Sequence, residues 1–347
     1  MAFLSFSNVK FAGVAAAVPK IVKEIKDLSF FSPGEADKVI ALTHIERSRM
    51  VPKGMCCSDL CYEAAEQLIE RLQWNKQDIG ALIYVSLSRD YLTPHTSALL
   101  QDKLGLSKEC YAIDVPLACS GYVYGLSVIA GLMQNGGIKK GLLLVGETTS
   151  QLQSPLDKTI WPLHGDGGTA TALEFNEGAS PMLFHFATDG SRGDAIINLD
   201  GGMRHPITEE SMRMIEVEPG IIRNRTQSVL DGISIKEPPA SIKSLTEYYD
   251  FSLDDIDYLI LHQANKYMDD KIGKKLKVPA DKIPFSLMQY GNTSSASIPI
   301  TMVVGIGEKL SLEDADVVIC GFGSGLSWGS AYIKLDHIIC LPLIELD

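Results

Sequence analysis

Asp78-Ile79-Gly80-Ala81-Leu82-Ile83 and Asp255-Ile256-Asp257-Tyr258-Leu259-Ile260 share one pattern, in which an acidic turn leads into an apolar run. The second stretch begins 177 residues after the first. Two further pairs have similar separations: residues 103–106 resemble 275–278 at 172, and the apolar run ending at Gly146 resembles the one ending at Gly321 at 175. Each pair alone is weak, because such helix-to-strand entries are common. Together they predict two halves of one topology, residues 1–180 and 181–347.

Around these pairs, apolar runs of strand length alternate with longer segments of helical period. The runs at 81–85, 141–145, 258–261 and 316–320 are apolar enough to be central strands covered on both faces. The segments at 59–72, 96–104, 121–134 and 242–249 have the apolar spacing of the helices that such strands require. The pattern therefore predicts a layered α/β fold.

Composition restricts the class of protein. The chain has 347 residues, of which 46% are hydrophobic and 21% are charged, and this length suggests about two domains. Its 31 Lys and Arg against 43 Asp and Glu give a net charge of −12, which disfavours nucleic acid as a partner. No apolar stretch reaches the roughly 18 residues of a membrane span, and the first residues lack a signal-peptide pattern. We expect a cytoplasmic protein with no membrane partner.

The seven cysteines form no C-x-x-C motif, and their odd number in a chain of this length favours reduced thiols. Cys56, Cys57 and Cys61 do cluster, but they begin an amphipathic helical segment with no histidine nearby in sequence. Packed thiols explain this cluster better than a metal site. We therefore expect no metal.

One cysteine stands in a different context. In Asp114-Val115-Pro116-Leu117-Ala118-Cys119-Ser120-Gly121 the chain passes from an apolar strand through small residues into a helix. Unpaired backbone amides and the helix dipole at such a position favour the thiolate, which lowers the pKa and makes Cys119 a candidate nucleophile. A small buried core cysteine is the alternative, because cysteine is often buried.

Two polar residues of the second half complete a constellation. His262 follows an apolar strand, and Asn292 lies in a Gly-led turn before a helix, 173 residues after Cys119 and thus at the matching place of the repeat. Alone, each has a structural explanation, as a strand-end histidine or a helix N-cap. Together with Cys119 they form a set that takes an acyl group as a thioester and stabilises an oxyanion or enolate.

Two glycine-rich segments, residues 165–170 and 321–330, add context. Neither is a phosphate loop: the first lacks the Gly-Lys-Ser/Thr ending, and the second is followed by a strand pattern. We expect the backbone to approach the active site closely there. In the second segment, Gly323, Ser324 and Gly325 are candidates to supply a backbone amide to an oxyanion on Cys119.

With Tyr290-Gly291-Asn292-Thr293-Ser294-Ser295-Ala296-Ser297-Ile298-Pro299, these motifs resemble β-ketoacyl-acyl-carrier-protein synthase III, of the thiolase-like superfamily, over nearly the whole chain. The resemblance implies a five-layer α-β-α-β-α fold of two similar halves, a homodimer and a role in fatty acid biosynthesis. It implies that Cys119 takes an acyl group from acyl-CoA, a substrate rather than a cofactor. His262 and Asn292 would then assist decarboxylation of malonyl-acyl-carrier protein, giving a 3-oxoacyl-carrier protein.

The sequence departs from the family at the substrate. Members commonly hold the CoA adenine with a Trp and an Arg, where this chain has Lys38 and Leu42. His164 replaces the usual Phe before Gly-Asp-Gly, and Thr93 replaces a residue that is often bulky before a proline. These changes favour a larger or more polar acyl pocket, and a specialised acyl group or a donor other than CoA.

The helix after His262 is rich in lysine, and the resemblance aligns Lys274 and Lys275 with the basic pair that members offer to the carrier protein. Lys266 is a further candidate for carrier docking. However, Tyr267 stands where an arginine is usual, and a solvated helix face explains the same lysines.

Several alternatives remain at this point. The nearest is an acyltransferase of the same fold that moves its acyl group to an alcohol, an amine or a small β-keto acid. Hydroxymethylglutaryl-CoA synthase needs an acidic base, for which no glutamate lies in a matching segment. A papain-like peptidase shares the order Cys-His-Asn but not the C-G-S-C-W surroundings of its cysteine. A catalytically dead partner subunit has no physical need for a thiol at a helix N-terminus.

Overall fold

A computed structural model describes residues 2–230 and 235–347 of the chain. Its first large sheet has seven strands and contains the predicted runs at 81–85 and 141–145. In sheet order its strands are β17 (Ile339–Cys340), β2 (Val9–Pro19), β8 (Gly167–Phe175), β7 (Lys140–Glu147), β5 (Ile79–Val85) and β6 (Tyr111–Val115), with β18 (Ile344–Leu346) also paired to β2.

The second large sheet contains the predicted runs at 258–261 and 316–320. Its order is β1 (Ala2–Phe6), β9 (Met182–Thr188), β16 (Ser327–Leu335), β15 (Ala315–Gly323) and β14 (Tyr258–Leu261). The pairs β9 with β16 and β16 with β15 are antiparallel, and β15 with β14 is parallel. The series β2, β8, β7 and β5 has the same directions in the first sheet. The internal repeat is therefore present in strand order.

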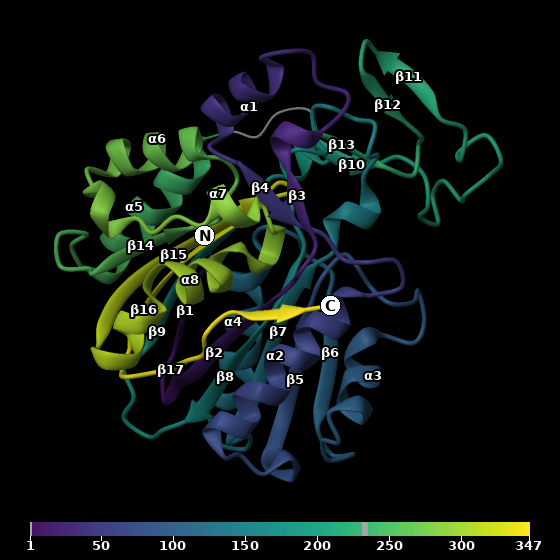
Figure 1. Cartoon of the computed structure of the whole chain (residues 1–347). Helices are drawn as coiled ribbons and strands as arrows, with labels where there is room; N and C mark the ends of the chain where they lie inside the picture. Colours follow the sequence, from purple (N-terminus) through teal and green to yellow (C-terminus); the bar gives the residue numbers. More distant parts are fainter. Residues whose placement is uncertain (1, 231–234) are drawn as a thin grey trace.

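Helices form three layers around the two sheets (Figure 1). α4 (Gly121–Met133) and α8 (Ser297–Leu312) contact strands of both sheets and form the middle layer. α2 (Cys57–Leu72) and α3 (Thr96–Lys103) cover the outer face of the first sheet, and α5 (Glu237–Tyr249) and α6 (Lys266–Leu276) that of the second. The shorter α1 (Glu35–Thr43) and α7 (Leu287–Tyr290) lie near α6 and β4. The predicted five-layer thiolase-like architecture is confirmed.

The middle helices are apolar on nearly all sides because each lies between two sheets. Gly125 shows how tightly α4 packs: a Cβ there would lie 2.7 Å from a Leu143 methyl and 2.8 Å from a Val85 methyl. The largest hydrophobic core joins these helices to the inner faces of both sheets. This packing fixes the N-termini of α4 and α8, from which the candidate residues extend.

The terminal strands cross between the halves. β1, the first strand of the chain, pairs with β9 in the second sheet, whereas β17 and β18 near its end pair with β2 in the first. Each sheet is thus completed by a segment from the other half of the sequence.

Three small two-stranded units lie outside the large sheets. They are β3 (Val22–Glu24) with β4 (Arg47–Arg49), β10 (Ile196–Asn198) with β13 (Ser228–Leu230), and β11 (Ile215–Glu218) with β12 (Ile221–Arg223). We call the segment from 196 to 230 the cap. The β11–β12 hairpin extends away from the layered body (Figure 1). None of the helices in the described part of the chain has the length and apolarity needed to cross a bilayer.

Candidate active site

A cavity of about 640 Å³ opens where α4 and α8 begin. Its wall is mainly apolar and includes residues of the cap, of the segment between β7 and β8, and of the N-terminal part of α6. Cys119, Asn292, His164 and Ser324 line it together, although they are far apart in sequence. A largely apolar cavity with a few convergent polar groups is the usual form of a small-molecule site.

Cys119 lies between β6 and α4, two residues before the helix begins. Its Sγ lies 3.6 Å from the Ser294 Oγ, which belongs to the other half of the fold. The closing glycine-rich strand passes directly beneath it: a Cβ at Gly323 would come within 2.6 Å of the Cys119 Cβ and 3.1 Å of its Sγ. A side chain at position 323 would collide with the thiol, which explains the glycine.

The protonation state of Cys119 differs from the expectation of a lowered pKa. Burial raises the pKa of this thiol to about 11, and the nearby carboxyl of Glu147 acts in the same direction, whereas the Ser294 contact lowers it. The desolvation of a buried thiolate therefore outweighs the favourable helix N-terminus. Cys119 rests as a thiol, and its proton must leave as it attacks.

Asn292 lies before α8, at the place that Cys119 occupies before α4, as the repeat predicts. Its backbone is fixed by two hydrogen bonds: its N–H donates to the Leu163 carbonyl (2.8 Å), and its carbonyl accepts from the Gly165 N–H (3.1 Å). Its side-chain Oδ1 accepts from the Ser294 N–H (2.8 Å). Because Oδ1 is occupied, Nδ2 is the group left to donate into the cavity.

His262 directly follows β14 and is fully buried, with its ring edge against Phe322. Its Nδ1 lies 2.7 Å from the Ser297 Oγ, which also accepts from the Gln263 N–H (3.3 Å). The Ser297 hydroxyl proton is then free to go to Nδ1, which leaves the proton of the neutral ring on Nε2. This Nε2 has no partner among the described residues. Burial lowers the pKa of His262 to about 3, with the His164 ring acting in the same direction.

One short segment, residues 292–297, joins the three candidates. It contains Asn292, its Ser294 contacts Cys119, and its Ser297 contacts His262. The structure therefore brings together the three residues that the sequence analysis grouped, and it also brings Ser324 to the cavity wall. Chemically, a thiol can act as a nucleophile, and the two nitrogen groups can donate hydrogen bonds.

The Gly165-Asp166-Gly167 motif approaches the site as expected. A Cβ at Gly165 would lie only 2.0 Å from the Tyr290 carbonyl oxygen, so a side chain there would displace the 290–292 segment. The Asp166 carboxylate accepts hydrogen bonds from the Val51 N–H (2.9 Å) and the Ser150 N–H (3.0 Å). These contacts fix residues 165–167 next to Asn292, whose carbonyl accepts from the Gly165 N–H.

Glu147, at the end of β7, is a cavity residue that the sequence analysis missed. Its carboxyl accepts from the Ser88 Oγ (2.6 Å), the N–H groups of Leu87 (2.9 Å) and Ser88 (3.1 Å), and the Ser86 Oγ (3.2 Å). Burial raises the pKa of Glu147 to about 7 despite these bonds. The sequence does contain a signal for this residue, because a glutamate at the end of a central apolar strand is unusual unless it serves a site.

The other predicted site residues take different places. Thr93 is exposed and is not part of the cavity wall of its own chain. Lys266 is partly buried and forms an ion pair with Asp270. Lys274 and Lys275 are exposed on the last turn of α6. The N-terminal part of the same helix contributes Tyr267 and Met268 to the cavity.

Comparison with known proteins gives one consistent result. Residues 113–190 match the family described as 3-oxoacyl-[acyl-carrier-protein] synthase III, and residues 247–335 match its C-terminal counterpart. The β-ketoacyl-[acyl-carrier-protein] synthase III of Streptococcus agalactiae serotype III is 32% identical over 328 residues, which are 94% of this chain and 99% of the relative. The protein of that name from Clostridium perfringens is 32% identical over 329 residues, with the same coverage.

A solved structure agrees with the sequence relatives. The crystal structure of a 3-oxoacyl-(acyl-carrier protein) synthase from Burkholderia xenovorans matches this fold with a TM-score of 0.92 at 30% identity, covering 99% of both chains. The resemblance inferred from the motifs is therefore confirmed over nearly the full length.

Proposed function

Because this chain belongs to the β-ketoacyl-acyl-carrier-protein synthase III family, we propose that it condenses an acyl thioester with malonyl-acyl-carrier protein through Cys119, His262 and Asn292. The observation that carries these roles is the 292–297 segment. It sets a thiol and an amide on one cavity wall and holds an imidazole, with an unpartnered Nε2, directly behind that wall.

The first half-reaction is acyl transfer. The Cys119 sulfur attacks the thioester carbonyl carbon, and the oxygen becomes an oxyanion that backbone amides near Cys119 and in the Gly323–Ser324–Gly325 loop stabilise. The bond between that carbon and the donor sulfur then breaks. The donor thiol leaves with the proton that Cys119 gives up, and the acyl group stays on Cys119.

The second half-reaction is decarboxylative condensation. The bond to the malonyl carboxylate breaks, CO₂ leaves, and the electron pair forms an enolate. Its oxygen accepts hydrogen bonds from the Asn292 Nδ2–H on the cavity wall and from the His262 Nε2–H once the bound substrate uncovers the ring behind that wall, both neutral donors. The enolate carbon attacks the acyl carbonyl, the carbon–sulfur bond to Cys119 breaks, and the thiolate takes up a proton from solvent. The product is a 3-oxoacyl-carrier protein.

The carrier protein is proposed to dock on the exposed face of α6. Lys274 and Lys275 present two positive charges there, on a chain whose net charge is −12. Local positive charge is what an acidic carrier needs in order to approach such a protein. The same helix reaches the cavity through Tyr267 and Met268, so a carrier bound there stands beside the opening.

A homodimer is proposed to form at β6, the last strand of the first sheet. Tyr111 of β6 is 45% exposed, and Leu92 in the neighbouring loop is 73% exposed. An open strand edge with exposed apolar side chains suits pairing with a second copy. In such a dimer the loop with Thr93 extends toward the partner, which is where we propose that Thr93 contributes to a pocket. We place this assembly in the cytoplasm.

Intact-protein mass spectrometry tests the function. Wild type and Cys119→Ala are incubated with a panel of acyl-CoAs and acyl-carrier proteins, and malonyl-carrier protein is then added. We expect a Cys119-dependent acyl adduct that malonyl-carrier protein discharges with release of CO₂. An adduct that only an alcohol or an amine discharges would refute the condensation.

A further inference from the structure

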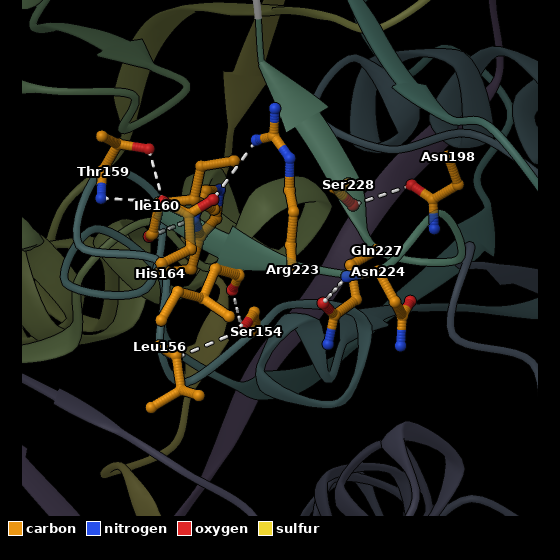
Figure 2. Close-up of polar contacts among 12 residues, drawn as sticks. Ser154, Leu156, Thr159, Ile160, His164, Asn198, Arg223, Asn224, Gln227 and Ser228 are labelled. Carbon is orange, nitrogen blue, oxygen red and sulfur yellow. Dashed lines mark hydrogen bonds and ion pairs between the residues drawn. The ribbon is translucent and has the colours of Figure 1, made fainter. Parts of the chain in front are cut away.

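One ring nitrogen of His164 has no hydrogen-bond partner among the described residues. Its Nδ1 lies 3.3 Å from the Ile160 carbonyl oxygen (Figure 2). A carbonyl oxygen only accepts hydrogen bonds, so Nδ1 carries the proton of the neutral ring and Nε2 is a bare acceptor. Burial lowers the pKa of His164 to about 4, so the ring stays neutral near neutral pH.

The bare Nε2 faces the cavity. No described residue bonds to it, yet it is not among the fully sealed unpartnered atoms, unlike the Nε2 of His262. His164 is part of the cavity wall and keeps accessible surface although it lies deep in the protein. Its free acceptor is therefore available to a molecule that fills the cavity.

A second polar group stands on the same wall. Gln153 is 7% exposed and lines the cavity. Its side-chain oxygen is sealed, whereas its Nε2, a donor, has no hydrogen-bond partner among the described residues and is not among the sealed atoms. Buried polar groups nearly always have partners in folded proteins. Two unfilled polar side chains within one segment, 153–164, therefore indicate a ligand with a polar substituent.

The segment is held rigidly, which fixes the direction of both groups. The Ser154 Oγ donates to the Ile222 carbonyl (2.5 Å), and Arg223 forms an ion pair with Asp157 (3.3 Å), so the segment is tied to the cap (Figure 2). On the other side, the buried Lys23 Nζ donates to the carbonyls of Trp161 (2.5 Å) and His164 (2.9 Å). Preorganised groups of this kind give selectivity because little ordering is needed on binding.

We infer that the acyl group accepted by this cavity carries a hydroxyl, which donates its proton to the Nε2 of His164 and has Gln153 as a second polar contact. A hydroxyl fits both groups, because it donates to an imidazole nitrogen and also accepts from a side-chain amide. The inference rests on the proposed function and names its substrate class: a hydroxyacyl thioester is the preferred primer.

The test compares matched thioesters. Rates of Cys119 acylation are measured by intact-protein mass spectrometry for butanoyl thioesters and their 2-, 3- and 4-hydroxy derivatives. The same rates are measured for hexanoyl thioesters and their 2-, 3-, 4- and 6-hydroxy derivatives, as CoA and as carrier-protein esters. At least one hydroxyl position is expected to react about tenfold faster than its parent, the value of one good hydrogen bond. His164→Phe replaces the acceptor by an apolar ring and is expected to make the hydroxyacyl and parent rates equal when both are measured in that variant.

Two controls keep the result interpretable. Leu163→Met changes the same wall without changing its polarity and is expected to retain the preference. If His164→Phe does not fold, the test uses Gln153→Leu instead, which is expected to reduce the preference for the hydroxyacyl thioester. The rate ratios of the wild type then complete the test. Equal rates for every hydroxyacyl thioester and its parent, or a preference that survives His164→Phe, would overturn the inference and leave the condensation intact. Failure of every thioester to acylate Cys119 would refute the proposed function instead.

Discussion

The two halves of the molecule place different chemistry at one structural position. In the first half, β6 is followed by Cys119 and then α4. In the second, Asn292 comes before α8, the matching middle helix. Both helix N-termini reach the same cavity, where Ser294 of the second half contacts the thiol of the first. The duplicated framework therefore supplies the geometry twice, and in the proposed mechanism the nucleophile comes from one half and the donors from the other.

If the proposed roles hold, the two half-reactions are separable. In that mechanism acyl transfer needs the thiol of the first half, whereas decarboxylation needs the nitrogen donors of the second. Each can be removed while the other remains, because Cys119 does not take part in the fixed geometry of Asn292 or His262.

The largest expected effect on the condensation rate comes from removing the thiol of the first half. Cys119→Ala is expected to lower condensation at least about 10³-fold, because the hydroxyl groups on the wall are much weaker nucleophiles than a thiol. Decarboxylation of malonyl-carrier protein, followed as CO₂ release, is expected to continue. Loss of decarboxylation in this variant, with an unchanged fold, would contradict the separation.

Removal of the amide donor tests the second half. Asn292→Asp keeps the oxygen that accepts from the Ser294 N–H but replaces the donor by an acceptor, so the local structure is preserved. Decarboxylation is expected to fall about 10²-fold or more, the usual effect of losing one oxyanion donor. Acylation of Cys119, measured by mass spectrometry, is expected to fall much less, because the new carboxylate disfavours the thiolate but removes no group that acyl transfer needs. Equal loss of both activities would show that Asn292 serves the first half as well.

A smaller effect is expected from Glu147, which tests the environment of the thiol in the first half. Its carboxyl raises the pKa of Cys119, so Glu147→Gln is expected to increase the thiolate fraction. At pH 8, where Glu147 itself is ionised, alkylation of Cys119 by iodoacetamide should become faster, because the neutral amide no longer disfavours the thiolate. The exposed Glu177→Gln serves as the matched control. Unchanged or slower alkylation would mean that the carboxyl acts only by holding the 86–88 loop.

The rate of decarboxylation, which the proposed donors of the second half support, is expected to be insensitive to pH. Because burial lowers the pKa of His262 to about 3, its ring remains a neutral donor at every pH above that value. Decarboxylation by Cys119→Ala should vary less than about twofold between pH 5.5 and 8. A rate that falls around pH 6.5 would show that His262 titrates normally. The same pKa shift affects the free energy of unfolding. Unfolded His262 binds a proton below about pH 6.5 whereas the buried ring does not, so this residue lowers the stability of the fold as pH falls.

Local pattern predicted much of the fold. The central strands and the helices that cover them are signalled by runs and periods within a few residues, and all eight predicted segments form the expected elements. Cys119 and Asn292 were paired because the repeat relates their positions. The family resemblance, carried by motifs in order, added the five layers and the reaction.

The remaining features depend on contacts that local pattern does not encode. The short strands β10 to β13 of the cap are three or four residues long and were not predicted. Glu147 is a cavity residue because a loop some sixty residues earlier in the chain donates to it. The raised pKa of Cys119 follows from its burial, which a helix N-terminus in sequence does not reveal.

The crossing of the terminal strands has a consequence for taking the molecule apart. A chain cut between residues 180 and 181 would leave a first fragment without β17 and β18, and a second without β1. Each fragment would therefore expose an open sheet edge that only the other can cover. We expect such fragments to be insoluble alone and to recover a native complex when produced together. The two halves of the sequence therefore stabilise each other, because neither sheet is complete without a strand from the other half.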